Sequence, residues 1–507
     1  MTAAARRVAL AWVAAALAGC ALTPPQAPPL PTPSTWRRVP GAESADRPAG
    51  RAPHTDATPP AVNAPGPRTR WWAALADPLL DELVAQSLAT AADVRTAQTR
   101  VREARARLAV AGAARLPSLS AAASANRTDA SAAASTGVAR DVYNAGFDAS
   151  WEADLFGRAS AGTDAARADL RASRASLDDA RLSLAAEVAR LYVQLRGQQA
   201  RLDVAWRNLQ TQSQTLQLTD WRAQAGLIGT LELQQARTAA EQTRAQVQAL
   251  RGSVAQTLES LAVLAGQPAG ELDARLSTAA PLPSAPATPV LAIPAETLSQ
   301  RPDVRTAEAQ WQAEAARTTA AQAARYPRLT LSGTLGLQAL SASALGRGDA
   351  ATSSLAASLV APVFDGGSLK AQAQAQDAVQ QRAAIAWEQT VRAAAGEVES
   401  ALAALDAARS RAAALEAATT AAREAARLAR IQYQGGVIDF RSVLDTERSL
   451  LSTEDSLAGA RADEVTAWIR LHKALGGGWD VAGERDDPAT GTPPAATTST
   501  VAPTPAR

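Results

Sequence analysis

The stretch DVRTAQ, Asp93 to Gln98, returns almost unchanged as DVRTAE, Asp303 to Glu308, 210 residues further along the chain. Three more segments recur at the same offset. They are ARLPSL with ARYPRL (from Ala114 and Ala324), AGLIG with GGVID (from Ala225 and Gly435), and VLAG with KALG (ending at Gly266 and Gly476). Four anchors at one spacing indicate an internal duplication, so the chain is expected to build one structural unit twice.

The bulk composition favours long helices over a large sandwich core. The chain has 507 residues, of which 20% are charged and only 4% aromatic, and alanine is abundant throughout. The length suits two or three ordinary domains. The net charge of +2 comes from 51 basic and 49 acidic residues. Such a near-balance gives no reason to expect nucleic acid as a partner.

The N-terminus is typical of a processed leader. Arg6 and Arg7 precede an apolar run of 11 residues, Val8 to Ala18, which is too short to span a bilayer. The run ends in LAGC, where Cys20 is the single cysteine of the chain. This arrangement resembles the bacterial lipoprotein signal, in which the cysteine becomes the first residue and carries lipid. The alternative is an ordinary secretory peptide with an incidental cysteine. No later segment has 18 consecutive apolar residues, so no transmembrane helix is expected.

Composition and repeat spacing divide the chain into six parts. A proline-rich stretch after Cys20 is typical of an extended tether, and the Pro/Thr/Ala-rich C-terminal end is typical of a disordered tail. The predicted parts are a signal peptide (1–19), an acylated cysteine with its tether (20–70), a first repeat (71–270), an inter-repeat linker (271–302), a second repeat (303–480) and a tail (481–507).

Each copy contains two stretches in which apolar residues alternate with polar ones. They are Ser118 to Asn126 and Tyr143 to Leu155 in the first copy, and Arg328 to Ala339 and Ser354 to Phe364 in the second. A period of two predicts strands with one apolar and one polar face, so the chain supplies four strands as two hairpins. The predicted apolar face carries Leu119, Ala121, Ala123, Ala125, Tyr143, Ala145, Phe147, Ala149, Trp151, Ala153, Leu155, Leu329, Leu331, Leu335, Leu337, Leu355, Ala357, Leu359 and Val363.

The remaining parts of each copy show helical patterns. In the first copy one pattern runs from Asp77 to Ala114 before the strands, and a longer one runs from Ala159 to about Ala225 after them. Leucine recurs there every seven residues, and a second set of apolar positions indicates a helix packed between two neighbours. At about 1.5 Å per residue this helix is roughly 100 Å long. Ser368 to Gln434 matches it, and a return helix follows each long one to Gly266 or Gly476. The members of the two heptad sets are Leu177, Leu184, Leu191, Val188, Leu195, Leu202 and Leu209, with Leu182 and Val193 on the second seam.

Four strands with an apolar face cannot close alone, because their edges would remain unpaired in lipid. Spanning barrels need about eight or more strands, so several copies would have to pool their strands into one barrel. The apolar faces would then meet lipid and the polar faces would line water. A soluble meander sheet packed on the helices would show the same alternation, so the pattern alone leaves both readings open.

Four motifs then carry a family resemblance over about residues 70 to 480. They are IPAETLSQRPDVRTAEAQ (Ile293 to Gln310), WEADLFGR (Trp151 to Arg158), PVFDGG (Pro362 to Gly367) and YQGGVIDFRSVLD (Tyr433 to Asp445). With them the sequence resembles the outer membrane factor family of TolC-like exit ducts, in particular the lipoprotein branch that serves RND-type efflux systems (NodT-like outer membrane efflux lipoproteins).

The resemblance implies a mainly α fold with membrane β-barrel strands. Three chains would form one outer-membrane β-barrel with four strands from each, continued by a long periplasmic α-helical coiled-coil barrel. The implied partners are two further copies in a homotrimer, a periplasmic adaptor (membrane fusion) protein, an inner-membrane RND-type transporter and outer-membrane lipid. The implied function is passive conduction of substrates that the pump expels through the adaptor.

The helix reversals are the predicted adaptor-docking tips. Their residues are Gly226, Leu227, Ile228 and Gly229 in the first copy, and Gly435, Gly436, Val437 and Ile438 in the second. An open tube would leak, so a gate is expected at this end. The second tip alone concentrates charge and an aromatic residue, and the predicted gate consists of Tyr433, Asp439, Arg441, Asp445 and Arg448. In this hypothesis Asp439 or Asp445 pairs with an arginine of the adjacent hairpin, such as Arg222 or Arg237.

The sequence offers no catalytic set. His54 and His472 lie far apart, and no Cys/His cluster, phosphate loop or nucleophile elbow occurs. We therefore expect no enzyme activity, no cofactor and no metal, apart from covalent lipid on Cys20. A non-conducting coiled-coil envelope scaffold is the alternative function, and a periplasmic enzyme is a third. Ion conductance of the purified protein separates the duct from the scaffold.

Overall fold

The computed structural model describes residue 36 and residues 68–128, 140–286 and 298–477. The predicted signal peptide, Cys20 with its predicted lipid, the predicted C-terminal tail and all of the predicted tether before residue 68 except Trp36 lie outside the described residues.

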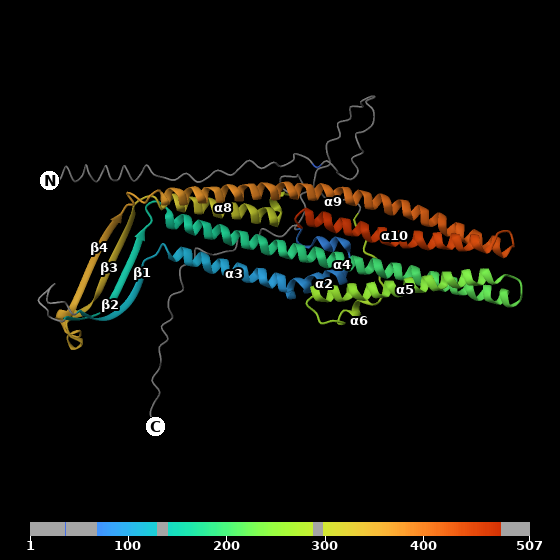
Figure 1. Cartoon of the computed structure of the whole chain (residues 1–507), viewed down its shortest axis with the longest axis horizontal. Coiled ribbons are helices and arrows are strands. Elements are labelled where there is room, and N and C mark those ends of the chain that lie inside the picture. Colours follow the sequence, from blue (N-terminus) through green and yellow to red (C-terminus); the bar gives the residue numbers. More distant parts are fainter. Residues whose placement is uncertain (1–35, 37–67, 129–139, 287–297, 478–507) are drawn as a thin grey trace, which may run out of the picture.

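The described chain is mostly helical and has one four-stranded sheet. Figure 1 shows the strands at one end and the helical hairpins reaching away from them, with their tips at the opposite end. In chain order the elements are η1 (Arg68–Leu75), α2 (Pro78–Thr90), α3 (Ala92–Ala113), β1 (Ser118–Thr128), β2 (Arg140–Ala153), α4 (Arg158–Gln224), α5 (Thr230–Leu264), α6 (Asp273–Leu276), α8 (Pro302–Ala323), β3 (Arg328–Ala339), η2 (Ala342–Ala344), η3 (Gly348–Ala350), β4 (Ala351–Val360), α9 (Ser368–Gln434) and α10 (Phe440–Ala474).

The main helices of the two halves of the chain match in length. Helices α4 and α9 have 67 residues each, the return helices α5 and α10 have 35 each, and α3 and α8 have 22 each. Both long helices begin after a glycine in the left-handed region, Gly157 with φ 77° and Gly367 with φ 87°. A residue with a side chain is strained there. The same backbone reversal therefore joins strand to helix in both copies.

The predicted helix from Asp77 to Ala114 is in fact two helices. The chain is extended at Ala91 (φ −59°, ψ 134°), which ends α2 and begins α3. Next to this break, the hydroxyl of Thr90 donates to the carbonyl oxygen of Ala265 at 2.7 Å. The prediction missed the break because alanine at position 91 carries no local stop signal.

Two strands end earlier than their alternation suggested. Leu155 and Val363 continue the apolar phase in the sequence, yet β2 ends at Ala153 and β4 at Val360. The carboxylate of Asp154 accepts from the backbone N–H groups of Ala159 and Ser160, which starts α4. Pro362 has no N–H for a ladder bond, so β4 cannot continue through it. Neither Leu155 nor Val363 belongs to the sheet.

The main hydrophobic core lies around a group of tryptophans where the peripheral elements meet the long helices. The rings of Trp71 and Trp72 are 5.7 Å apart, and Trp71 lies 5.9 Å from Trp468 of α10. Trp36, from the predicted tether, is buried in the same cluster. This core fixes the start of the first copy against the end of the second.

The heptad positions of α4 are confirmed as packing positions. Leu177, Leu184 and Leu191 are buried, and so are Leu182 and Val193 of the second seam. The helix contacts α3, α5, α8 and α10. Two apolar seams on one helix allow it to lie between neighbours on both sides, which is what a helical tube wall requires.

Candidate functional site: channel wall and tips

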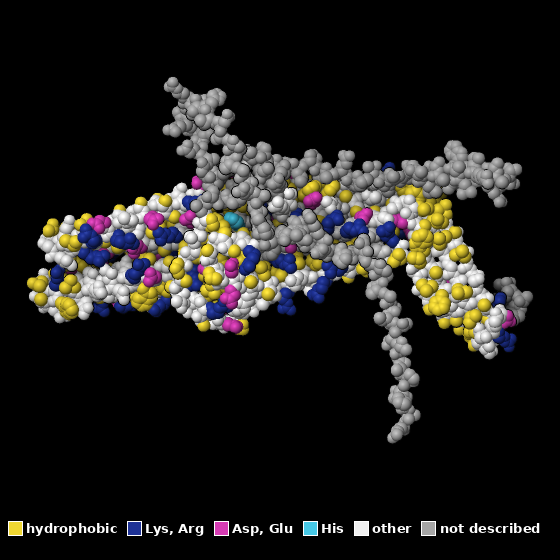
Figure 2. All heavy atoms as spheres, turned by 180° about the vertical axis from the view of Figure 1, so that it is seen from behind, with side chains coloured by type: hydrophobic (Ala, Val, Ile, Leu, Met, Phe, Trp, Pro, Cys, Tyr) yellow, Lys and Arg dark blue, Asp and Glu magenta, His cyan; other side chains and the backbone are white. Residues whose placement is uncertain are grey.

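The sheet has one apolar and one polar face, as predicted. The antiparallel order is β1-β2-β3-β4, and directly paired residues point to the same side. Ala121 pairs with Phe147, Phe147 with Leu335, and Trp151 with Leu331, so the predicted apolar residues of these strands share a face. Leu335 is 64% exposed and Leu355 87% exposed in the single chain. In Figure 2 hydrophobic side chains gather over the strands, whereas charged ones are spread along the helices.

The opposite face carries hydroxyl, amide and carboxylate groups. Asn144 donates to the hydroxyl of Ser124 at 3.3 Å and accepts from the amide of Gln338 at 2.9 Å. Thr334 and Ser354 share a hydrogen bond of 2.8 Å. These hydrogen bonds join each strand to its neighbour on one face of the sheet. Such a surface suits contact with water.

The outer edges of this sheet are unpaired within the chain. Among the described strands, β1 pairs with β2 alone and β4 pairs with β3 alone. Exposed edges present free N–H and C=O groups, which cannot be left unpaired in lipid. The sheet is therefore complete only when strands of other chains add to both edges.

Two sequence motifs hold the strands to the helical tube. In WEADLFGR the guanidinium of Arg158 binds both carboxylate oxygens of Glu152 at 3.0 Å. In PVFDGG the carboxylate of Asp365 accepts from the N–H groups of Gly367 (2.9 Å) and Leu369 (2.7 Å), which starts α9. Both motifs thus position a long helix directly after its strand.

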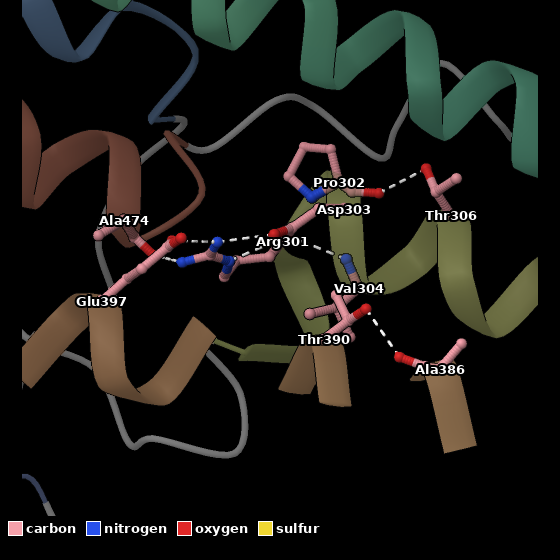
Figure 3. Close-up of polar contacts among 9 residues, drawn as sticks. All are labelled: Arg301, Pro302, Asp303, Val304, Thr306, Ala386, Thr390, Glu397 and Ala474. Carbon is pink, nitrogen blue, oxygen red and sulfur yellow. Dashed lines mark hydrogen bonds and ion pairs between the residues drawn. The ribbon is translucent and has the colours of Figure 1, made fainter. Parts of the chain in front are cut away.

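The RPDVR motif forms a buried clamp, shown in Figure 3. The side chain of Arg301 is 7% exposed. It donates to Asp303 at 3.0 and 2.7 Å, to Glu397 of α9 at 2.7 Å and to the carbonyl oxygen of Ala474 at 2.7 Å. The clamp joins the start of α8, the middle of α9 and the end of α10. The sequence had offered this motif only as a family signature.

The charge of Arg301 also sets the ionisation of its neighbour. Burial by itself raises the pKa of Asp303, but the hydrogen bonds and positive charge of Arg301 outweigh it and hold that pKa below its ordinary value. The first copy has Ala91 at the position of Arg301, and there Thr90 caps the return helix instead. The duplicated unit therefore closes by different chemistry in its two copies.

Both predicted tips lie at the helix reversals. Gly226 (φ 70°) and Gly436 (φ 73°) have left-handed backbones, and Leu227 and Val437 beside them are each 74% exposed. The other two glycines do not need to be glycine, because Gly229 is extended and Gly435 is helical. The reversal thus depends on one glycine in each tip. The predicted docking residues are at the ends of the hairpins: Gly226, Leu227, Ile228, Gly229, Gly435, Gly436, Val437 and Ile438.

The predicted gate residues are brought together at the second tip, with contacts that differ from the hypothesis. Asp439 caps α10, accepting from the N–H (2.9 Å) and hydroxyl (2.6 Å) of Ser442. These hydrogen bonds lower the pKa of Asp439. Asp445 lies 3.9 Å from Arg441 and 3.7 Å from Arg448 on its own helix.

The arginine of the first tip meets an aromatic ring instead. Arg222 lies 5.3 Å from the ring centroid of Tyr433, and that ring lies 5.5 Å from Phe440. Among the described residues of one chain, the ion pairs of Asp445 stay within α10 and the predicted latch to Arg222 or Arg237 is not formed. Pairing between hairpins of neighbouring chains stays a prediction.

The described part of the chain holds no cluster of three or more histidine, cysteine or acidic side chains placed to bind a metal ion. In the same residues, no helix has both the length and the apolarity that crossing a bilayer would take.

Comparison with known proteins agrees with this architecture. The family model of the outer membrane efflux protein matches residues 83–267 and 293–477. The pyoverdine export outer membrane protein OpmQ of Pseudomonas putida is 33% identical over 423 residues, which cover 82% of this chain and 89% of that protein. The solvent efflux pump outer membrane protein SrpC of Pseudomonas putida is 29% identical over 470 residues, covering 92% and 97%.

The fold has a solved counterpart. The outer-membrane channel OprN superposes with a TM-score of 0.79 at 33% identity, and the match covers 90% of this chain and 99% of that one. The unpaired sheet edges, the two-faced strands and the 67-residue helices are the parts that such a channel assembles from three chains. The chain belongs to the outer membrane efflux protein family, whose trimeric TolC-like channels are the outer-membrane exit ducts of tripartite efflux systems.

Proposed function

We propose that this chain is the lipid-anchored exit duct of an RND-type system, passively conducting what an inner-membrane transporter drives through a periplasmic adaptor. The observation that carries the proposal is the two-faced sheet. Its polar face, with Ser124, Asn144 and Gln338 hydrogen-bonded across strands, suits a water-filled passage. Its apolar face suits hydrocarbon. A coiled-coil scaffold without a pore has no use for such strands.

The duct would perform no chemical step. Charged groups of the described residues that lie close together engage each other, as in the Arg301 clamp and the Glu152–Arg158 pair. Free energy for transport would then come from the pump. OpmQ and SrpC both match most of this chain, yet their names refer to different cargo, pyoverdine in one and solvents in the other. That diversity supports selection of cargo at the pump and not in the duct wall.

The tips are the proposed contact with the adaptor. Leu227 and Val437 project from the two hairpin ends at 74% exposure, and Leu231 is 69% exposed beside the first. Exposed apolar side chains at a rim favour a protein partner. Because each chain has two tips, a trimer presents six similar contacts around its axis.

Reconstitution tests the proposal. Purified trimers in planar bilayers are expected to conduct ions, and cells that carry the pump and adaptor but lack this chain are expected to lose export until it is restored. Intact trimers that insert without conducting would favour the scaffold function instead.

A further inference from the structure

The seam between the two helical hairpins of one chain begins near the tips with a small apolar cluster. Phe440 and Leu444 of α10 pack there with Ala236 and Ala239 of α5, against Leu216 of α4. Phe440, Leu444, Ala236 and Ala239 are each 4% exposed or less. This cluster holds the second hairpin against the first, and it is formed within a single chain.

A polar layer follows the apolar cluster, away from the tips. Gln212 of α4, Thr243 of α5 and Glu447 of α10 each lie three or four residues from the cluster member of their own helix. Residues at that spacing share a helix face, so each of the three lies on the face of its helix that carries a member of the cluster. They are 4%, 3% and 3% exposed. The seam therefore buries a carboxyl group.

The buried carboxyl has an incomplete set of partners. Both carboxylate oxygens of Glu447, and the Oε1 atom of Gln212, are buried without a hydrogen bond. The Nε atom of Arg430 lies 3.4 Å from Glu447 Oε1, but the Arg430 side chain is 44% exposed. An ionised carboxylate that loses water and gains no hydrogen bonds is costly, and such groups commonly bind a proton instead.

The surrounding helices add no second cation to the pair. On the packing face of α5 the neighbours are alanines and Thr243. The charged side chains at this level are exposed or engaged elsewhere. They are Arg237 and the Glu241–Arg244 pair on α5, Asp220 (bound to Gln224) and Arg222 (over Tyr433) on α4, Asp445 with Arg448 on α10, and, on α9, Arg427 paired with Glu424 and Arg423 paired with Glu454 of α10. Burial raises the pKa of Glu447 above its ordinary 4.5, and Arg430 lowers it by less.

We propose that Glu447 is a proton-binding site that makes packing of the two hairpins depend on pH. The carboxyl holds its proton to higher pH while the seam is closed, and it ionises more readily when the seam parts and water reaches it. Protonation removes the buried charge and turns one oxygen into a donor, in a layer where Gln212 has an unused acceptor. In the proposed duct, on which this last step rests, acid would favour hairpins that are held together at the tips.

The direction follows from linkage. A carboxyl whose pKa is higher in the closed seam stabilises that seam fully below its ordinary pKa, and the effect is lost as the pH rises through the raised value. Each unit of that rise changes the closing equilibrium about tenfold. The first copy cannot do the same, because the residue 210 positions earlier is Arg237, which is exposed.

Hydrogen exchange on intact trimers tests the site. The measured quantity is the protection factor of the backbone amides in 430–447, which divides out the intrinsic dependence of the exchange rate on pH. For the wild type this factor is expected to fall, between acid and alkaline conditions, by about tenfold for each unit by which the closed seam raises the pKa of Glu447. Glu447→Gln, which mimics the protonated form, should keep high protection throughout. Glu241→Gln removes a 52% exposed carboxylate on α5, outside the predicted gate, and should retain the wild-type pH dependence.

Infrared spectra supply a second readout that does not depend on how the variants pack. A protonated carboxyl band should titrate in the wild type and be missing in Glu447→Gln. Wild-type protection that is independent of pH, or a pH dependence that survives Glu447→Gln, overturns the proton site. Conductance of the same trimers separates the two proposals: non-conducting trimers with the pH dependence overturn the duct alone, and conducting trimers without it overturn the proton site alone.

Discussion

Phe147 of β2 lies directly opposite Leu335 of β3, on the apolar face of the sheet. The next pair along the ladder, Asp148 with Thr334, lies on the other face. One step along two strands therefore changes the surroundings from hydrocarbon to water. This alternation gives each strand a role in both the membrane surface and the passage, and it makes the two faces differ in what they tolerate.

Charge on the apolar face should block assembly. Leu331→Arg and Leu335→Arg place a cation in lipid, at a cost of about 2–4 kcal/mol each near the bilayer midplane. Thr330→Arg and Thr334→Arg, one residue away on the polar face, should be mild. Trimer yield in outer membranes measures the difference, and equal yields for the two pairs would reverse the facing assignment.

The Arg301 clamp should contribute to stability more than an exposed ion pair does. Arg301→Ala removes the hydrogen bonds of a buried guanidinium to Asp303, Glu397 and the Ala474 carbonyl, and the loss of such charged hydrogen bonds costs about 2–3 kcal/mol. Arg107→Ala, which removes an exposed pair with Glu103, should change stability by about 0.5 kcal/mol or less. Denaturant unfolding followed by circular dichroism measures both. Equal effects would mean that the clamp adds nothing to folding.

The tip reversals should depend on one glycine each. Gly436→Ala forces a side chain into a backbone with φ 73°, at a cost of about 1–2 kcal/mol. Gly226→Val and Gly436→Val should weaken crosslinking to the adaptor while the barrel still assembles. Gly435→Ala is the control, because Gly435 is helical and a Cβ there would meet only ordinary contacts at 3.6 Å or more. Crosslinking unchanged in the valine variants would remove these turns from the interface.

The second tip should limit conduction. Asp439→Ala combined with Arg441→Ala removes the cap of α10 and one partner of Asp445, so single-channel conductance should rise with the barrel intact. Asp439→Ser with Arg441 kept retains a capping oxygen and should conduct as the wild type does. Conductance of the double variant equal to wild type, in trimers shown to be intact, would place the gate elsewhere.

The cap at Asp439 has its own pH window. Hydrogen bonds from Ser442 lower the pKa of Asp439, so the cap is fully present above the ordinary value of 3.8 and is lost as the pH falls through the lowered one. The effect of Glu447 has the opposite sign: its stabilisation of the seam is present below pH 4.5 and is lost as the pH rises above that value. Conductance measured below pH 3.8 and above pH 4.5 should therefore distinguish the two groups.

Anchoring should depend on Cys20, the single cysteine of the chain. Cys20→Ser is expected to abolish incorporation of labelled fatty acid, while strand insertion survives, because the sheet carries its own apolar face. Equal label in the variant and the wild type would overturn the lipoprotein assignment.

Much of this protein could be predicted from local pattern. The alternation in the strands and the sevenfold leucine spacing each depend on neighbours close in sequence, and the offset of 210 residues is found by comparing the sequence with itself. Strand pairing and buried seams agree with these patterns. The ends of the elements depend on more than the pattern. Leu155 and Val363 kept the apolar phase beyond strands that a helix cap and Pro362 had already ended.

What the sequence by itself determined, then, is the repeated unit, its two-faced strands and its long helices, because periodicity is a property of neighbouring residues. The tertiary structure alone decided which polar groups are buried and what they touch. Arg301 meets residues 96 and 173 positions away, and Glu447 is buried on a helix that packs against α9 of its own repeat and α4 of the first repeat. The local sequence pattern does not indicate that Glu447 is buried while Arg237, the residue at the same position of the first repeat, is exposed. The burial of a charge depends on which distant segment covers it, and only the folded chain supplies that cover.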